Sequence, residues 1–192
     1  DVYKRQVLYM YNFTFNIPTK IHFGKDTISS LSELKAYGSK VLLVYGGGSI
    51  KKNGLYDTAM KILKDAGLTV FELSGVEPNP KIETVRKGVE ICKNEGIDMV
   101  LAIGGGSTID CSKVVAAGAR YDGDAWDLVL DGSKVKAALP IFDVLTLSAT
   151  GTEMDPFAVI SDMSKNEKWG TGSPYMVPTM SILNLSLIHI SE

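Results

Sequence analysis

The sequence predicts an α/β fold in which a parallel sheet is covered by helices on both faces. Between residues 40 and 119, short apolar segments alternate with longer segments of helical periodicity. The apolar segments contain almost no polar residue, which is typical of strands that are buried on both faces. Two of these strands run directly into a glycine triplet, as expected where the chain turns sharply from a strand into a helix.

The expected strands follow from runs of apolar and β-branched residues. Two short strands are expected around the turn at 17–19, and buried strands occupy the middle of the chain. The expected ranges are 13–16, 20–23, 40–45, 68–73, 98–103 and 142–147, with later strands at 158–161 and from 181 onward. Their spacing leaves room for a helix between most consecutive strands, as parallel pairing requires.

The expected helices follow from apolar residues three and four positions apart. They cover residues 26–34, 55–65, 83–94 and 107–119, with a short helical turn inside the polar connection 121–133. Gly67 and Gly96 stop two of them, and Ser107 is placed to cap the helix that follows the second glycine triplet.

Composition narrows the function classes. The 192 residues are 45% hydrophobic and 22% charged, with a net charge of −2. The sequence has no basic stripe, so we expect no nucleic-acid partner. It has no apolar run of about 20 residues and no segment that resembles a secretion leader, so we expect no membrane partner. The two cysteines have no metal-binding or redox spacing. A cytoplasmic protein that acts on a small molecule is the expectation.

Both ends of the chain depart from the pattern of the rest. Residues 1–9 continue no periodicity, and a natural start would be Met10. Residues 185–192 break off directly after the segment "SILN". We therefore expect one dinucleotide-binding domain at 10–184, with a non-native leader at 1–9 and a non-native tail at 185–192.

The two glycine loops are the first candidate site. The segments "VYGGGSI" and "AIGGGSTID" match neither the GxGxxG nor the GxxxxGK[ST] motif, but both follow strands. Ligands of open parallel sheets lie beyond the carboxyl ends of the strands, and helix N-termini favour phosphate. The candidates are Gly46, Gly47, Gly48, Ser49, Gly104, Gly105, Gly106, Ser107 and Asp110. The alternative is that the triplets are only tight turns and that Asp110 is a first-turn acid.

A third candidate loop follows the strand expected at 142–147. The segment "TLSATGTEMD" supplies the hydroxyl groups of Thr146, Ser148, Thr150 and Thr152, which suit contacts to phosphate and ribose. Threonine-rich turns without a ligand are the alternative. The acids Glu153 and Asp155 either shape such a site or hydrogen-bond the loop itself.

The order and spacing of several motifs resemble the iron-containing (group III) alcohol dehydrogenases, most closely their butanol dehydrogenase branch. The resemblance covers residues 10–184. It rests on "NIPTKIHFGKD", "VYGGGSIKKNGLYD", "GVEPNP", "AIGGGSTIDCSKVVAA", "WDLVLDGS", "LTLSATGTEMDPFAVIS", "NEKWG" and "SILN". It implies a Rossmann-like N-terminal domain and a helical, metal-binding C-terminal domain that is missing here. It also implies reduction of aldehydes, or oxidation of primary alcohols, with a nicotinamide cofactor in a homo-oligomer.

The resemblance also implies roles for individual residues. The second glycine loop, with Asp110, would wrap the pyrophosphate. Thr146, Ser148 and Thr150 would line the nicotinamide side. Asn79 of "EPNP" and Lys168 of "NEKWG" would touch the ribose groups.

The first glycine loop bears on the choice of cofactor. Family members specific for NAD tend to carry an aspartate there, whereas this chain has no acid until Asp57. A 2′-phosphate would meet backbone amides, the Ser49 hydroxyl and Lys51 or Lys52, which favours NADP(H) over NAD(H). Two observations oppose this: the lysines can equally form a solvated face, and the butanol branch includes enzymes that use NADH.

The family's metal site cannot be assigned to this chain. One aspartate and three histidines hold iron or zinc in the family, but this chain has only His22 and His189. No catalytic residue and no metal ligand is therefore assigned, and the chain alone is expected not to catalyse. The alternatives are a glycerol or polyol dehydrogenase, a dehydroquinate-synthase-like lyase, a non-catalytic nucleotide-binding module, or a structural protein.

Overall fold

A computed structural model describes residue 14, residues 16–187 and the backbone of residues 189–190. The expected strand at 13–16 falls mostly outside these residues, and its described positions 14 and 16 lie in no strand. The strand expected at 20–23 is present as β1 (Lys20–Gly24), and its partner in the sheet is the late strand β9 (Met180–Asn184).

Six parallel strands form the central sheet, which confirms the expected fold class. Besides β1 and β9 they are β2 (Lys40–Tyr45), β3 (Thr69–Leu73), β4 (Met99–Gly104) and β5 (Ile141–Leu145). The order across the sheet is β1-β9-β5-β4-β2-β3, and every neighbouring pair is parallel. The expected strand at 142–147 is thus two residues shorter at its end.

The order of the strands reverses between β2 and β4. From β2 the chain passes outward to β3 and then returns to the other side of β2 as β4. In open α/β sheets such a switch point is where ligands bind, at the carboxyl ends of the strands. Tyr45 pairs with Ile103 at these ends, so the two glycine loops leave the sheet side by side.

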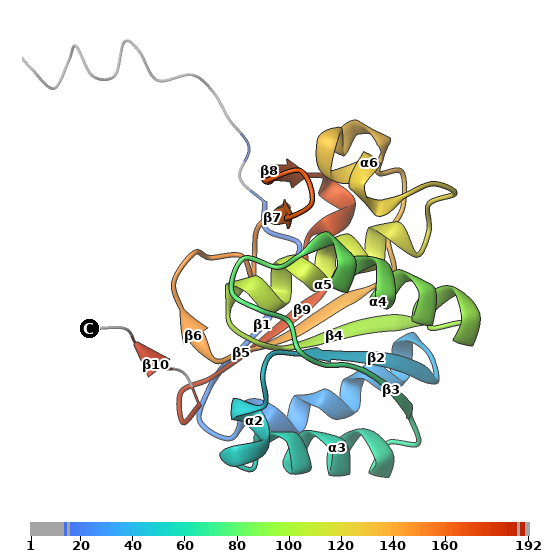
Figure 1. Cartoon of the computed structure of the whole chain (residues 1–192). Coiled ribbons are helices and arrows are strands. Elements are labelled where there is room, and N and C mark those ends of the chain that lie inside the picture. The colour runs from blue at the N-terminus through green and yellow to red at the C-terminus, as the bar shows by residue number, and fades with distance from the viewer. Residues whose placement is uncertain (1–13, 15, 188, 191–192) are drawn as a thin grey trace, which may run out of the picture.

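Helices cover both faces of the sheet, as expected (Figure 1). The 3-10 helix η1 (Thr27–Tyr37) and α3 (Leu55–Asp65) pack on one face. On the other lie α4 (Ile82–Glu95), α5 (Gly106–Gly118) and α6 (Ala125–Leu130).

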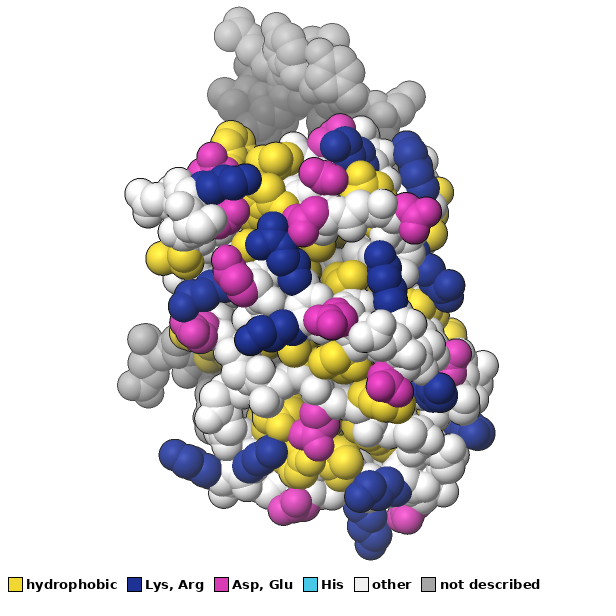
Figure 2. All heavy atoms as spheres, turned by 45° about the vertical axis from the view of Figure 1, so that its right-hand side comes forward, with side chains coloured by type: hydrophobic (Ala, Val, Ile, Leu, Met, Phe, Trp, Pro, Cys, Tyr) yellow, Lys and Arg dark blue, Asp and Glu magenta, His cyan; other side chains and the backbone are white. Residues whose placement is uncertain are grey.

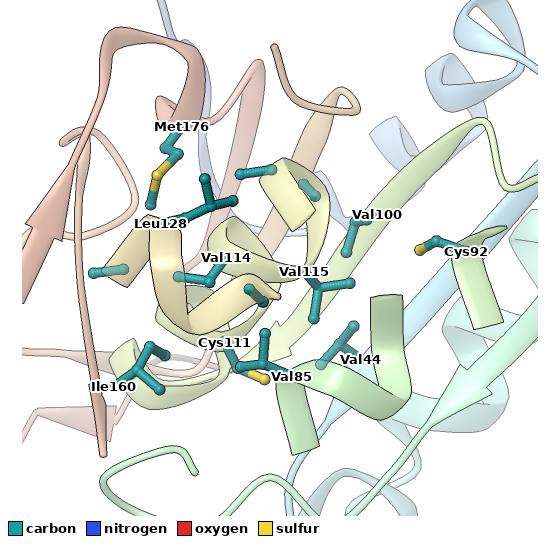
Figure 3. Close-up of a cluster of buried hydrophobic side chains, with 14 of the residues drawn as sticks. Val44, Val85, Cys92, Val100, Cys111, Val114, Val115, Leu128, Ile160 and Met176 are labelled. Carbon is teal, nitrogen blue, oxygen red and sulfur yellow. The ribbon is translucent and has the colours of Figure 1, made fainter. Parts of the chain in front are cut away.

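Side chains of the strands alternate between the two cores with the period of two that a pleated strand imposes. Val41 and Leu43 belong to the core of α3, whereas Leu42 and Val44 belong to the core of α4 and α5. Figure 3 shows Val44 and Val100 of the sheet beside Val85 of α4 and Val115 of α5.

Two helix ends follow the expected glycine stops. At the end of α3, Gly67 has φ +77°, and the Leu68 amide donates to the Leu63 carbonyl over 3.0 Å. Gly96 likewise has φ +62°, and the Ile97 amide donates to the Cys92 carbonyl. The helix expected at 26–34 is present as the 3-10 helix η1 over residues 27–37. Its Ser29 and Ser32 hydroxyls donate to carbonyls three residues earlier, in keeping with the tighter winding.

An antiparallel hairpin stands beside the main sheet. The expected strand at 158–161 is β7 (Phe157–Asp162), and its partner β8 (Glu167–Gly172) was not expected. Two short strands, β6 (Leu147–Ser148) and β10 (His189–Ile190), pair in parallel. The remaining short elements are α2 (Ser49–Lys52), η2 (Gly132–Lys134) and η3 (Pro174–Met176).

The surface mixes both signs of charge. On the face drawn in Figure 2, lysine and arginine side chains alternate with aspartate and glutamate, so neither sign dominates there. Among the described helices, none combines the length and the apolar composition that a membrane span needs.

Candidate functional site

Three loops emerge at the carboxyl ends of three adjacent strands. The first glycine loop (residues 46–49) follows β2, the second (104–107) follows β4, and a hydroxyl-rich segment, here called the hydroxyl loop (146–155), follows β5. The Thr146 amide donates to the Gly104 carbonyl over 2.9 Å, so the second and third loops leave the sheet together. The Gly75 amide donates to the Gly46 carbonyl over 3.2 Å and backs the first loop.

The N-terminus of α5 presents amide groups at this edge. Gly105 occupies the N-cap position with extended backbone, and no side chain accepts from the first turn. Ser107 is the second residue of the helix, so its expected role as N-cap is wrong. The cause is that the Gly105 carbonyl already accepts the first helical bonds, from Thr108 and Ile109. The amides at the start of a helix that precede these bonds have no carbonyl partner within the helix. Together with the positive end of the helix dipole, such amides suit a phosphate group.

The glycines of the two loops have different reasons to be glycine. Gly48 has φ +103°, and a Cβ on Gly104 would lie 2.5 Å from Thr108 Oγ1, so the fold itself requires these two. Gly47 and Gly105 have ordinary φ, and a Cβ on them would meet nothing closer than Leu147 Cβ, 3.5 Å from the position on Gly105. Neither packing nor backbone conformation explains their lack of a side chain, whereas close approach of a ligand would explain it.

The hydroxyl loop lies against the second glycine loop. A Cβ on Gly106 would lie 3.1 Å from Thr150 Oγ1, which places that hydroxyl beside the start of α5. Ser148 and Thr150 are exposed and Thr146 is half-buried, so these side chains are accessible. Thr152, in contrast, is buried and belongs to the support of the loop.

Asp110 joins α5 to the hydroxyl loop and to the hairpin. Its carboxylate accepts from Thr152 Oγ1 over 2.7 Å and from the Val159 amide over 3.0 Å. Burial raises the pKa of Asp110, and these two hydrogen bonds oppose the rise. The described first turn of α5 holds no acidic residue, so Asp110 does not act there as a first-turn acid. Its contact with a pyrophosphate stays a prediction.

Sequence reasoning missed Lys113, the one fully buried lysine among the described residues. Its ammonium donates over 2.8 Å to Thr152 Oγ1, to Asp155 Oδ1 and to the carbonyls of Asp155 and Phe157. Burial lowers the pKa of Lys113, and the neighbouring Asp155 carboxylate opposes the fall. The available signal was a lysine one helical turn after Asp110, followed by the apolar run "VVAA". Asp155 therefore hydrogen-bonds the loop, which is one of the two roles considered for it.

Asn79 and Lys168, 89 residues apart, meet in the structure. Lys168 Nζ donates to Asn79 Oδ1 over 2.6 Å, and both side chains are exposed. Asn79 lies in the loop after β3, and Lys168 lies on β8. The Ser161 amide of β7 donates to the Pro80 carbonyl over 2.9 Å, which fastens the hairpin to that loop.

An aromatic and acidic cluster lies beside the first glycine loop. Lys51 Nζ lies 5.0 Å from the ring centre of Tyr45 and 4.5 Å from that of Tyr56. Both tyrosine hydroxyls donate to Glu72, over 2.6 and 2.8 Å, and Lys51 Nζ lies 3.9 Å from the same carboxylate. These hydrogen bonds, that from Tyr45 first, lower the pKa of Glu72. Ser49 is exposed at the start of α2.

No metal site can be built from the residues that the structure describes. Among them, no three histidine, cysteine, aspartate or glutamate side chains lie close enough together to hold an ion. His22 Nε2 instead lies 3.2 Å from Glu33 Oε1, beside β1. Cys111 is buried within the core that α5 shares with α4 and α6.

Comparison with known proteins identifies the family. The family model "Iron-containing alcohol dehydrogenase" matches residues 18–185. The NADH-dependent butanol dehydrogenase A of Clostridium acetobutylicum is 60% identical over 91% of this chain and 45% of its own length. An NADPH-dependent aldehyde reductase of Escherichia coli is 40% identical over 91% of this chain and 46% of its own length.

Solved structures agree with this likeness. The crystal structure of the NADH-dependent butanol dehydrogenase A from Thermotoga maritima matches with a TM-score of 0.90 and 50% identity, over 93% of this chain and 45% of that one. The chain thus spans about half the length of the relatives that it matches. The match over residues 18–185 shows that the chain belongs to the iron-containing alcohol dehydrogenase family.

Proposed function

We propose that this chain is the cofactor-binding portion of an NAD(P)H-dependent alcohol dehydrogenase or aldehyde reductase. The enzyme would transfer a hydride between the nicotinamide and a primary alcohol or aldehyde. The carrying observation is that three loops with accessible amides and hydroxyls follow the adjacent strands β2, β4 and β5 at the switch point of the sheet.

The proposed binding mode assigns one part of the dinucleotide to each loop. The second glycine loop and the start of α5 bind the pyrophosphate through backbone amides, with Asp110 beside them. Thr146, Ser148 and Thr150 contact the nicotinamide side. Asn79 and Lys168 contact the ribose groups, and the first glycine loop, residues 46–49, receives the adenosine end.

The choice between NADH and NADPH belongs to the proposal as well. The absence of an acid in the first glycine loop favours NADP(H), with Lys51 or Lys52 near the 2′-phosphate. The Glu72 carboxylate offsets part of the charge of Lys51. The relatives include both cofactor types: the butanol dehydrogenase that is 60% identical is named NADH-dependent, and the aldehyde reductase that is 40% identical is named NADPH-dependent.

The rest of the catalytic apparatus is proposed to lie outside these 192 residues. The chain covers 45% of the length of the butanol dehydrogenase relative. We propose that the metal ligands and most of the substrate pocket belong to a helical segment that follows residue 184, and that 1–9 and 185–192 are foreign to the domain. The whole protein would be a cytoplasmic homo-oligomer acting on small alcohols and aldehydes.

The first test is a titration of the purified chain with NADH and with NADPH, followed by nucleotide fluorescence. Gly47→Ala and Gly105→Ala are the informative variants, because their new methyl groups would meet no protein atom closer than 3.5 Å. Gly170→Ala on β8 is the matched control, since its Cβ would lie 4.0 Å from the nearest atom, Val159 Cγ2.

We expect saturable binding of a dinucleotide that weakens in the two loop variants and persists in the control. The thermal midpoints of all three variants should stay close to that of the unsubstituted chain. Dinucleotide binding that is indifferent to both loop substitutions would remove the glycine loops from the site. A chain that binds neither dinucleotide would contradict the proposed function of this portion.

A further inference from the structure

Lys113 is a buried cation whose partners all belong to the hydroxyl loop or to the strand that follows it. Its side chain is 0% exposed, and a buried ammonium is tolerated only when it is paired and hydrogen-bonded. Four oxygen atoms, each 2.8 Å away, surround its three N–H groups. The ammonium is therefore fully satisfied, and the residues around it are fixed in turn.

The oxygen atoms around Lys113 span the end of the hydroxyl loop. Thr152 contributes its hydroxyl, Asp155 its carboxylate and carbonyl, and Phe157, the first residue of β7, its carbonyl. The Asp155 carboxylate also accepts from the Phe157 amide over 2.8 Å, which closes the turn into β7. The Lys113 side chain thus binds three residues between 152 and 157 and holds this part of the chain against α5.

Asp110, on the same helix as Lys113, also binds the hydroxyl loop. Thr152 Oγ1 accepts from Lys113 and donates to Asp110 Oδ1 over 2.7 Å, so Thr152 bridges two charged groups one turn apart on α5. Because α5 begins at the second glycine loop, the two proposed binding loops are fastened to a single rigid element. The accessible hydroxyls of Ser148 and Thr150 precede this anchor and take no part in it.

From this geometry, and resting on the proposed function, we propose that Lys113 is a positioning residue for the cofactor. It holds the hydroxyl loop against the second glycine loop through Thr152 and Asp155, so that the Thr150 hydroxyl and the amides of α5 face the same ligand. Lys113 itself does not touch the dinucleotide. Preorganised donors bind a ligand without the cost of ordering them first, so loosening the anchor should weaken binding.

Substitutions at Thr152 test the anchor with the least disturbance. Thr152→Val keeps the shape of the side chain but removes the hydroxyl that bridges Lys113 and Asp110, and Thr152→Ser keeps the hydroxyl. Lys113→Met is the direct variant, but it strips Asp155 of its cation and can unfold the chain. Lys87→Met, at an exposed position of α4, is the control for loss of a lysine.

Two measurements are made on the whole chain: hydrogen–deuterium exchange of peptides covering residues 146–160, and the dissociation constant for NADH or NADPH. We expect Thr152→Val to speed exchange of the amides of 151–159 and to weaken dinucleotide binding by about tenfold, or ~1.4 kcal/mol. Thr152→Ser should restore both, and Lys87→Met should change neither. Lys113→Met, where it folds, should exceed the effect of Thr152→Val.

Failure of this proposal and failure of the proposed function are distinguishable. Exchange in Thr152→Val that equals that of the unsubstituted chain overturns the anchor. Faster exchange with an unchanged dissociation constant overturns the link between the anchor and the cofactor. An unsubstituted chain that binds no dinucleotide overturns the proposed function and the cofactor role of Lys113 with it, whereas the exchange data still decide whether Lys113 holds the loop.

Discussion

Lys168 Nζ donates a 2.6 Å hydrogen bond to Asn79 Oδ1 and thereby joins the hairpin to the loop after β3. Asn79 holds its side chain there with left-handed backbone, φ +57°, a conformation that asparagine tolerates better than most residues. The parallel bridge between Lys81 and Ser161 provides a second tie between the same two segments. The two residues expected to touch ribose are therefore neighbours, although neither lies in a glycine loop.

The first prediction concerns this pair. Asn79→Gly removes the amide without straining the left-handed backbone, and Lys168→Met removes the ammonium. Because both side chains are exposed, we expect each variant to change the free energy of unfolding by less than about 1 kcal/mol. Each should nevertheless weaken dinucleotide binding several-fold, as measured by fluorescence titration.

The double variant shows whether the two residues act together. If Asn79 orients Lys168 toward the ribose, the loss of binding in the double variant is smaller than the sum of the two single losses, in free energy. Independent, additive losses would contradict a joint role. Lys134→Met, on η2, serves as the control for removal of a lysine.

The second prediction concerns the charge beside the first glycine loop. Glu72→Gln removes a negative charge 3.9 Å from Lys51 and leaves a side-chain oxygen to accept from a tyrosine hydroxyl. If a 2′-phosphate binds near Lys51, the affinity for NADPH should rise relative to that for NADH by roughly fivefold. A fivefold change in that ratio corresponds to ~1 kcal/mol of binding free energy.

The measurement is the ratio of the two dissociation constants in the unsubstituted chain and in the variant. Glu90→Gln, at an exposed position of α4, should leave this ratio unchanged. An unchanged ratio in Glu72→Gln would place the 2′-group of the cofactor away from this cluster.

The centre of the main sheet could be predicted because β2 and β4 are almost continuous apolar runs. The run Val41–Val44 and its counterpart Met99–Ile103 have no polar residue that would suggest an exposed face. The two loops were predictable for the same reason, since each glycine triplet directly follows such a run. Strand β8 was missed because its sequence, "EKWGTG", has two charges and two glycines and owes its shape to pairing with β7.

The support of the site could not be read from local patterns. Apart from the apolar run that follows it, Lys113 looks like an ordinary helix-surface lysine, and its oxygen partners lie 39 to 44 residues further along the chain. Its burial is set by the tertiary position of the hydroxyl loop, which no periodicity in the sequence encodes. Likewise Ser107 has the chemistry of an N-cap, but the backbone of Gly105 takes that position.

The third prediction concerns the contact between α4 and α5. Gly88 lies in the middle of α4, where alanine would ordinarily stabilise a helix by about 0.5–1 kcal/mol. Here a Cβ would lie 2.7 Å from Val115 Cγ2 and 2.8 Å from Leu73 Cδ2. We therefore expect Gly88→Ala to lower the free energy of unfolding by about 1–3 kcal/mol through overpacking.

Urea unfolding measures this effect. The additional substitution Val115→Ala opens space for the new methyl group, so it should cost less in the Gly88→Ala background than alone. Glu90→Ala in the same helix should change stability by no more than about 0.5 kcal/mol. A stabilised Gly88→Ala chain would mean that α4 and α5 lie farther apart than in the structure.

The fourth prediction concerns Asp143, an acid in the middle of the sheet. It lies on β5 between Ala102 of β4 and Ser181 of β9, and it is 1% exposed. Burial is the main cause that raises the pKa of Asp143 to about 8, and the nearby Glu153 adds to the rise. The hydrogen bond with Ser181 and the charge of Lys113 oppose it.

The local geometry fits a protonated carboxyl group. Ser181 Oγ lies 2.6 Å from Asp143 Oδ2 and 2.7 Å from the Glu153 carbonyl oxygen. The single hydroxyl proton of Ser181 can serve only one of these two contacts. A proton on Asp143 supplies the other, so both contacts are hydrogen bonds when the carboxyl group is neutral.

Stability should therefore fall as the pH rises. Between the ordinary value of about 3.9 and the folded value of about 8, folded Asp143 keeps a proton that the unfolded chain has lost. The free energy of unfolding then decreases by up to ~1.4 kcal/mol for each unit of pH. The contribution of Asp143 to stability is complete below the pKa of the unfolded chain and is lost above the pKa of the folded chain. The raised pKa of Asp110 acts in the same direction. Acids with lowered pKa values, such as Asp98 and Glu72, act oppositely but lose their stabilisation only as the pH falls below this range.

Asp143→Asn isolates the effect, because an amide keeps the shape and one donor but does not titrate. Urea unfolding between about pH 5 and pH 8 should show a steep loss of stability in the unsubstituted chain and a much flatter curve in this variant. Asp57→Asn, at an exposed position of α3, should retain the steep dependence. Equal slopes in the unsubstituted chain and in Asp143→Asn would show that Asp143 is ionised in the folded protein, and the contact with Ser181 would then have to be a bond from the serine hydroxyl to a buried carboxylate.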